Sequence, residues 1–147
     1  MSGTGAFRSG GRWNSPGRHV VYASGHLSLA MLELLVHVDD AEALLGIPHS
    51  YRSIGFTADD VATLAEDDLP SAWNARPEAR ASKLAGDEWL DSRSTLVLAV
   101  PSVIVPPDLR YEPSYLNYLI NPRHPAFAAA ITLGGIRELI WDPRLVR

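Results

Sequence analysis

The sequence contains no cysteine, which excludes disulfide bonds, thiol nucleophiles and thiolate metal ligands. An excess of positive charge is also missing: 13 basic and 17 acidic residues give a formal charge of −4, and the basic residues stand singly. We therefore expect no direct binding to nucleic acid and no basic patch for a membrane surface. A chain without cysteine suits a reducing compartment, and we expect a cytoplasmic protein.

Long apolar runs and a targeting segment are absent as well. The longest apolar stretches, residues 29–38 and 96–105, are too short or too interrupted to span a bilayer. The N-terminal residues 1–7 are small and polar and lack the apolar core of a signal peptide. A chain of 147 residues, of which 46% are hydrophobic and 20% charged, is expected to fold as one soluble domain.

Three familiar catalytic signatures are missing. The five histidines do not combine at metal-binding spacings on one element, so we expect no metal site. The pair Gly3-x-Gly5 neither follows a strand nor opens a helix, which excludes a Rossmann or Walker phosphate loop. Ser102 lacks a Gly-x-Ser-x-Gly elbow, which argues against a hydrolase nucleophile. It is either a turn serine or a hydroxyl that orients another polar group.

Hydrophobic periodicity predicts an α+β fold. A loop is expected over residues 1–18, and Ser28 or Ser24 is expected to cap the first helix. The expected helices cover residues 28–38, 57–65 (with a capping box) and 78–90. The expected strands cover residues 19–24, 49–57, 94–100 continued by 103–105, 115–120, 128–133 and 137–141. Strands and helices mix without the regular alternation of a doubly wound sheet, which favours the α+β class.

The segment from the first glycine pair to the first helix contains the most informative pattern of the chain. Gly10-Gly11-Arg12-Trp13-Asn14 places Arg12 in a glycine-bracketed turn, Tyr22 follows in an extended run, and Glu33 stands in the middle of an apolar helix. Burying a carboxylate among leucines is costly unless it has a partner. Arg12 is the obvious partner, directly or through a shared ligand, and its planar guanidinium suits a pyrophosphate. The pattern indicates an anion-binding, charge-stabilising site.

Plainer interpretations of the same residues stay open. Glu33 and His37 are four residues apart, so they could pair on the helix at its boundary with solvent. Arg12 could lie in a flexible surface loop with a solvated side chain, although a tryptophan such as the adjacent Trp13 rarely sits in a loop without packing against something.

Further motifs point to one family when they are taken together with this segment. They are, in order, Gly10-Gly11-Arg12-Trp13-Asn14, Val21-Tyr22-Ala23-Ser24, Leu29-Ala30-Met31-Leu32-Glu33-Leu34-Leu35-Val36-His37, Leu69-Pro70-Ser71-Ala72-Trp73, Gly86-Asp87-Glu88-Trp89-Leu90, Val100-Pro101-Ser102, Asn117-Tyr118-Leu119-Ile120-Asn121-Pro122-Arg123-His124-Pro125 and Asp142-Pro143-Arg144-Leu145. Their order and spacing resemble the RES domain, which forms the toxin half of many bacterial toxin–antitoxin pairs. The resemblance covers nearly the whole chain, so we expect residues 1–147 to form a single RES domain. Family members usually carry a strand before the stretch matched here by residues 2–6, so we expect either a start codon assigned too late or a trimmed copy without this strand.

The resemblance implies mixed or antiparallel sheets with flanking helices, as in ADP-ribosyltransferases, and NAD⁺ as the substrate. Cleavage of the nicotinamide–ribose bond creates an oxocarbenium-like ribose, which the Glu33 carboxylate would stabilise. Arg12 would hold the pyrophosphate, and Tyr22 would stack on the nicotinamide ribose or bond to it. Ser102 would orient Glu33 or the ribose hydroxyls. No metal is expected, and no cofactor beyond NAD⁺ as substrate.

The resemblance also implies what the protein does. Family members destroy NAD⁺ by hydrolysis or phosphorolysis, or transfer ADP-ribose to a protein. We therefore expect a toxin that is an NAD⁺ glycohydrolase or phosphorylase, with a protein ADP-ribosyltransferase and an N-terminally truncated, non-catalytic antitoxin-binding module as alternatives. The implied partner is an Xre-class helix-turn-helix antitoxin, and a homodimer is a further candidate assembly. Asn14, Asn121 and His124 fall in matching motifs but are given no catalytic role.

Overall fold

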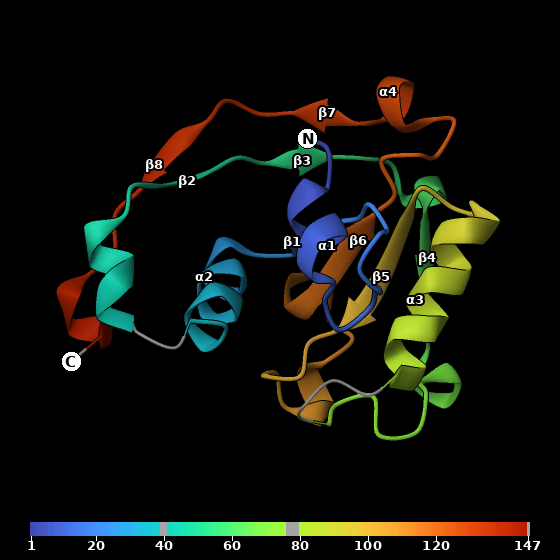
Figure 1. Ribbon diagram of the computed structural model, residues 1–147, viewed down its shortest axis with the longest axis horizontal. Helices are drawn as coiled ribbons and strands as arrows, with labels where there is room; N and C mark the ends of the chain where they lie inside the picture. Colours follow the sequence, from blue (N-terminus) through green and yellow to red (C-terminus); the bar gives the residue numbers. More distant parts are fainter. Residues whose placement is uncertain (39–40, 76–79, 147) are drawn as a thin grey trace.

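The main sheet has four strands in the computed structural model, which describes residues 1–38, 41–75 and 80–146 (Figure 1). Its strands, in spatial order, are β1 (Val21–Ser24), β6 (Leu116–Ile120), β5 (Val97–Pro101) and β4 (Val61–Thr63). β6 runs antiparallel to both β1 and β5, whereas β4 runs parallel to β5. The sheet is mixed and helices accompany it, so the predicted α+β class is confirmed.

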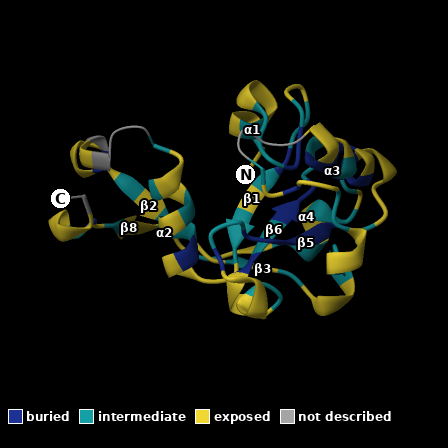
Figure 2. Ribbon diagram, turned by 90° about the horizontal axis from the view of Figure 1, so that it is seen from below, coloured by how far each residue is buried: buried dark blue, intermediate teal, exposed yellow. Residues whose placement is uncertain are grey.

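The core is built on both faces of strand β5. This strand is buried along its whole length because it lies between β6 and β4 and is covered above and below, which explains its continuous apolar sequence (Figure 2). Helix α3 (Arg80–Ser92) contributes Trp89 and Leu90 to one face. The buried residues of that face are Trp13, Val20, Trp73, Trp89, Leu90, Leu98, Val100 and Leu119, and those of the other face are Leu96, Val97 and Ile120.

Outside the main sheet, two short ladders form a ribbon (Figure 1). β2 (His49–Tyr51) pairs antiparallel with β8 (Arg137–Leu139), and β3 (Ile54–Gly55) pairs antiparallel with β7 (Thr132–Leu133). The remaining α-helices are α1 (Thr4–Ser9), α2 (Leu27–Val36) and α4 (Phe127–Ala130), and 3-10 segments cover Ala41–Gly46, Ala58–Asp60, Glu66–Asp68, Pro107–Leu109, Pro113–Tyr115 and Pro143–Val146. Within the described ranges, no helix has the length and apolar character needed to cross a membrane.

The predictions that rested on long or strongly apolar patterns are confirmed. Strands β1, β6 and β8 fall in the predicted strand ranges, and β5 extends one residue beyond the range predicted for it. Helix α2 matches the first predicted helix to within two residues at its end. A helix was predicted over residues 78–90, and α3 covers residues 80–90 of it and continues to residue 92. Residues 78 and 79 lie outside the described part of the chain.

Two predictions in polar or glycine-rich segments are wrong. Residues 1–18 are not all loop, because α1 forms between Gly3 and Gly10, which have φ values of 67° and 70° and so begin and end the helix. The capping box of Thr57 and Asp60 is present, but it caps a single 3-10 turn. The chain then extends into β4, because pairing with β5 outweighs the local helical preference.

Three strand predictions also need correction. Residues 103–105 turn away from the sheet, since the Ile104 N–H donates to the Ser102 hydroxyl at 3.2 Å in place of a strand partner. The alanine-rich start of residues 128–133 is helical and belongs to α4, and only its end forms β7. The strand predicted over residues 49–57 is divided into β2 and β3.

Helix α3 approaches the N-terminal loop closely at Gly86. A Cβ atom on Gly86 would lie 1.8 Å from the main-chain oxygen of Trp13. The next residue, Asp87, accepts a hydrogen bond from the Ser15 N–H at 2.9 Å and pairs with Arg18 Nε at 3.2 Å. The helix therefore anchors the loop that precedes β1.

Gly86→Ala is expected to lower the free energy of unfolding by about 1–3 kcal/mol, because the added methyl group must displace the Trp13 carbonyl from its place against α3. Urea denaturation followed by circular dichroism measures this change. Gly5→Ala is the matched control, since a Cβ atom there meets nothing within 4 Å and alanine favours the helix that contains it. Equal destabilisation of the two variants would contradict the close approach.

Candidate active site

The carboxylate of Glu33 is held by polar side chains at one end of the main sheet. Its Oε1 accepts hydrogen bonds from Ser102 Oγ at 2.7 Å and from Asn117 Nδ2 at 2.5 Å. Asn117 Oδ1 accepts one from Ser24 Oγ at 2.7 Å, and Ser102 Oγ accepts one from the Ile104 N–H at 3.2 Å. We call Ser24, Glu33, Ser102 and Asn117 the carboxylate cluster.

Strand pairing brings this cluster together. Ser24, the last residue of β1, lies opposite Asn117 of β6, and Val100 of β5 lies opposite Asn117 on the other side. Side chains that lie directly opposite one another share a face of the sheet. Ser102 follows the last residue of β5, so its hydroxyl emerges at the same end of the sheet as Ser24.

The turn between β1 and α2 returns the chain toward this end of the sheet. A Cβ atom on Gly25 would lie 2.1 Å from the main-chain oxygen of Pro113, so only glycine allows this close passage. Tyr118 donates to the same oxygen at 3.1 Å, and burial raises the pKa of Tyr118, which keeps this donor protonated.

His26 caps α2 by accepting from the Ser28 N–H at 3.2 Å, so the predicted serine cap is wrong.

The surroundings of Glu33 differ from those expected of a carboxylate among packed leucines. Leu29 is the only buried residue of α2, all of which is described, whereas Leu32 and Leu34 on either side of Glu33 are 49% and 37% exposed. Glu33 is half-buried, with its carboxylate on the sheet. The alternative of a Glu33–His37 pair is wrong, because the His37 ring donates to the main-chain oxygen of Glu33 at 2.6 Å.

The loop that carries Arg12 is anchored to the body of the protein. Arg12 Nη1 donates to the main-chain oxygens of Trp73 at 2.7 Å and Ala75 at 3.1 Å. The Trp13 ring is 2% exposed and stacks on the Trp73 ring, with 6.0 Å between their centroids. The alternative of a flexible surface loop with a solvated arginine is therefore wrong.

Asn14 and Tyr22 hold this loop against β1. Tyr22 Oη donates to Asn14 Oδ1 at 2.8 Å and accepts from the Trp13 N–H at 3.1 Å. Both of these hydrogen bonds of the Tyr22 hydroxyl are made with the loop. The residue as a whole is nevertheless 41% exposed. Asn14 is completely buried, and its Nδ2 faces the main-chain oxygens of Ala6, Ser15 and Arg18.

The Arg12 loop and the carboxylate cluster lie on the same face of β1. Tyr22 and Ser24 are two residues apart on this strand, so their side chains point to the same side. Arg12 and Glu33, which are both described, form no ion pair with each other. Their direct partnership is therefore wrong, and their partnership through a shared ligand stays a prediction.

Sequence reasoning did not assign Asn117 and Ser24 to the site. The signal for Asn117 was a single amide within the otherwise apolar strand of residues 116–120, where a polar side chain needs a partner. Asn121 and His124, which were given no catalytic role, bond to main-chain groups of α3 and of the turn after β6.

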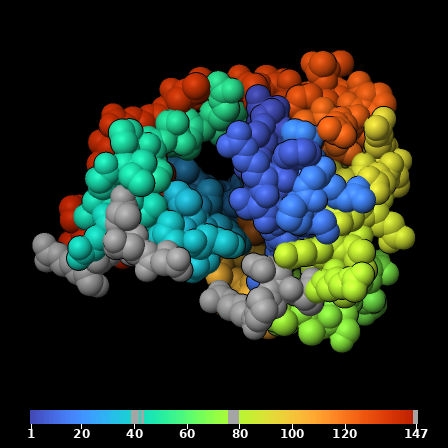
Figure 3. Space-filling model, viewed as in Figure 1, coloured from blue at the N-terminus to red at the C-terminus, as the bar shows by residue number. Residues whose placement is uncertain are grey.

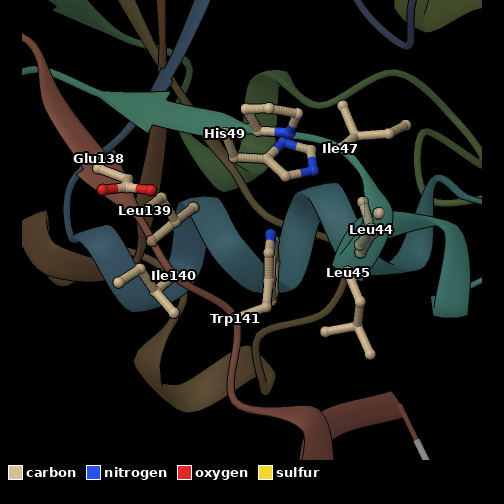
Figure 4. A pocket seen from close by; sticks show the side chains of 10 residues that line it. Leu44, Leu45, Ile47, His49, Glu138, Leu139, Ile140 and Trp141 are labelled. Carbon is tan, nitrogen blue, oxygen red and sulfur yellow. The ribbon is translucent and has the colours of Figure 1, made fainter.

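Two pockets are lined by residues outside the carboxylate cluster. One of about 250 Å³ is in the ribbon, where it is lined by residues 44–49 and 138–141, including His49 and Trp141 (Figure 4). The other, of about 290 Å³, is lined by Met1, Ser50, Tyr51, Arg52 and Ile136.

Figure 3 also shows the surface hollowed between the N-terminal segment and α2. Among the described residues, no group of three or more His, Asp or Glu side chains could hold a metal ion.

Comparison with known proteins gives consistent results. The family model of the RES domain matches residues 1–142. A Prs ADP-ribosylating toxin of Sphingobium sp. (strain YBL2) is 38% identical over 152 residues, which cover 100% of this chain and 87% of that protein. A Toxin Res of Yersinia enterocolitica is 35% identical over 144 residues, which cover 98% and 89%, and one of Pseudomonas putida is 40% identical over 134 residues, which cover 88% and 83%.

A solved structure shares the fold. The crystal structure of the M. tuberculosis MbcT–MbcA toxin–antitoxin complex contains a chain with a TM-score of 0.70 and 19% sequence identity. The match covers 99% of the present chain and 79% of that chain.

Tyr22→Phe is expected to lower the free energy of unfolding by about 1–3 kcal/mol, because the buried Asn14 oxygen and the Trp13 N–H both lose their partner. Urea denaturation measures the loss. Tyr115→Phe is the control, because Tyr115 has the same 41% exposure and its hydroxyl bonds to no described residue. If Tyr22→Phe is as stable as this control, the hydroxyl does not hold the loop.

Proposed function

The chain belongs to the RES domain family, and we propose that it is the toxin of a toxin–antitoxin pair and cleaves the nicotinamide–ribose bond of NAD⁺. The observation that carries the proposal is the state of the Glu33 carboxylate. Its Oε1 is held by two donors, and its Oε2 accepts no hydrogen bond from any described residue. Relatives named Toxin Res, and one named an ADP-ribosylating toxin, support an enzyme that acts on NAD⁺.

The chemistry requires a fixed negative charge beside the ribose. When the bond breaks, its electron pair moves to the nicotinamide nitrogen, so nicotinamide leaves as a neutral base and positive charge develops at the ribose carbon. A pre-oriented carboxylate stabilises that charge, as it does in glycoside hydrolysis. Glu33 performs this role through Oε2, while Ser102 orients it through Oε1. Attack by water then releases ADP-ribose and a proton, and attack by phosphate gives the phosphorolysis product.

The Arg12 loop supplies the other end of the site in this proposal. The contacts of Arg12 Nη1 with two carbonyl oxygens orient the planar guanidinium, which suits the bidentate binding of a pyrophosphate. Because the Tyr22 hydroxyl is bonded to the loop, stacking of its exposed ring on the nicotinamide ribose is favoured over a hydrogen bond to it. The hollow between the N-terminal segment and α2 is where the dinucleotide would lie (Figure 3).

A protein acceptor is the second candidate. The relative that is 38% identical over the whole of this chain is named an ADP-ribosylating toxin, which favours transfer of ADP-ribose to a protein. Incubation with NAD⁺ labelled in its adenylate part distinguishes the reactions. Label on a protein of a cell lysate indicates transfer, free labelled ADP-ribose indicates hydrolysis, and a product that forms only with added phosphate indicates phosphorolysis.

The proposal includes a protein antitoxin. The structural neighbour is the toxin–antitoxin complex of MbcT and MbcA, which supports such a partner. An Xre-class helix-turn-helix protein is the form that the family resemblance implies, and a homodimer of the toxin remains a prediction. Co-purification with the product of the adjacent gene tests the first, and light scattering of the purified chain tests the second.

Glu33→Gln is expected to lower the rate of nicotinamide release from NAD⁺ by about 100- to 1000-fold, because the amide keeps the shape of the side chain but lacks the charge that stabilises the ribose cation. Chromatographic assay of nicotinamide measures the rate. His37→Gln is the matched control, since the His37 ring contacts Glu33 only at its main-chain oxygen, and its rate is expected to remain within about twofold.

Two outcomes would decide against parts of this proposal. Equal rates for wild type and Glu33→Gln would remove Glu33 from the reaction. Binding of NAD⁺ by the wild-type protein without release of nicotinamide, in the presence or absence of phosphate and lysate, would favour the non-catalytic alternative.

A further inference from the structure

We propose that Asn117 is a positioning residue that fixes the orientation of the Glu33 carboxylate, and that Ser24 in turn fixes the Asn117 amide. The inference rests on the proposed function, because it assigns Asn117 to the same reaction as Glu33. Its geometric basis is the contact of 2.5 Å between Asn117 Nδ2 and Glu33 Oε1 and that of 2.7 Å between Ser24 Oγ and Asn117 Oδ1.

The two donors of the cluster converge on one carboxylate oxygen. Asn117 Nδ2 and Ser102 Oγ both donate to Oε1, whereas Oε2 accepts from no described residue. Hydrogen bonds to a charged acceptor are short and strong, so this pair of donors holds the plane of the carboxylate. Ser102 alone would leave the carboxylate able to rotate about a single contact. With Asn117 in place, two donors anchor Oε1, and Oε2 accepts no hydrogen bond from a described residue.

The Glu33 carboxylate, which only accepts hydrogen bonds, selects the orientation of the Asn117 amide, and the Ser24 hydroxyl holds the amide in that orientation. An asparagine amide can turn over and exchange its oxygen and nitrogen, and only its hydrogen-bond partners select one orientation. The Ser24 hydroxyl donates to Oδ1, while Nδ2 faces the carboxylate. In the reverse orientation two acceptor oxygens, Oδ1 and Glu33 Oε1, would face each other. The contact between Ser24 and Asn117 therefore follows from the strand register, which places these two residues opposite each other.

Helix α2 does not supply this rigidity by itself. Leu29 is its only buried residue, and Leu32 and Leu34 are largely exposed, so packing does little to direct the Glu33 side chain. Asn117 belongs to β6, which lies between β1 and β5 and has Leu119 fully buried two residues away. A catalytic group on a weakly packed element requires support from a rigid one, and β6 provides it.

Asn117→Asp is the sharpest test, because it keeps the size of the side chain and an acceptor for Ser24 but replaces the donor to Glu33 by an acceptor. We expect Asn117→Asp and Asn117→Leu each to lower kcat for nicotinamide release by about 10- to 100-fold, with KM for NAD⁺ within about threefold, because the carboxylate is misplaced rather than lost. Ser24→Ala is expected to lower kcat as well, but by a smaller factor. His37→Gln is the control. Retention of kcat within twofold in Asn117→Asp would overturn the proposal.

A double-mutant cycle separates positioning from a general structural role. In the Glu33→Gln background, Asn117→Leu is expected to change kcat by less than about twofold, because the group that Asn117 positions no longer carries a charge. A merely structural Asn117 would cost the same factor in both backgrounds, and that outcome would overturn the proposal. Thermal unfolding of each variant identifies any that fail to fold. If Asn117→Leu is one of them, the positioning role is decided by Asn117→Asp, by Ser24→Ala and by the spectroscopic measurement below.

A spectroscopic signature tests the contact without relying on activity. One side-chain amide proton of Asn117, assigned in the ¹⁵N–¹H spectrum by its loss in Asn117→Leu, is expected to lie downfield in the wild type and to move upfield in Glu33→Gln. An Asn117 signal that does not respond to Glu33→Gln would overturn the positioning role. Absence of nicotinamide release from the wild type, with this signal present, would instead reject the proposed function and leave the contact intact.

Discussion

The antiparallel pairing of β1 with β6 is the constraint on which the candidate site depends. This register places Ser24 opposite Asn117 and Tyr22 opposite Leu119, so one face of β1 receives both the carboxylate cluster and the Arg12 loop. A shift by one residue would turn every side chain of β1 to the other face and would separate Ser24 from Asn117. Gly25 then allows the chain to turn beneath Pro113 into α2, which returns Glu33 to the end of the sheet.

Both charged groups of the candidate site are held by hydrogen bonds within the protein itself. Arg12 is oriented by two carbonyl oxygens and by the packing of its neighbour Trp13, and Glu33 by a hydroxyl and an amide. Preorganisation of this kind reduces the entropy that binding and reaction must lose. In the proposed function Arg12 and Glu33 act on different parts of one ligand, which agrees with the absence of an ion pair between these two residues.

Predictions succeeded where one pattern dominated a segment. The apolar run of β5 and the periodicity of α3 identified these elements, because burial alone selects them. They failed where two weak preferences competed, as in β4, where pairing with β5 converts the end of a predicted helix into a strand. Arg12, Tyr22, Glu33 and Ser102 of the candidate site were predicted from the sequence. Asn117 was overlooked because a single amide in a strand does not reveal which carboxylate lies across the sheet.

The order of motifs along the chain was sufficient to identify the RES domain, the α+β class and four candidate site residues. Only the tertiary structure decided how these residues relate in space. Arg12 binds carbonyl oxygens of residues 61 and 63 positions away, and Asn117 meets Glu33 across 84 positions of sequence. Local patterns report burial and backbone preference within a few residues, whereas such contacts arise from strand register and close glycine approaches. For that reason the donors to Glu33 and the acceptors around Arg12 could be identified only in the folded chain.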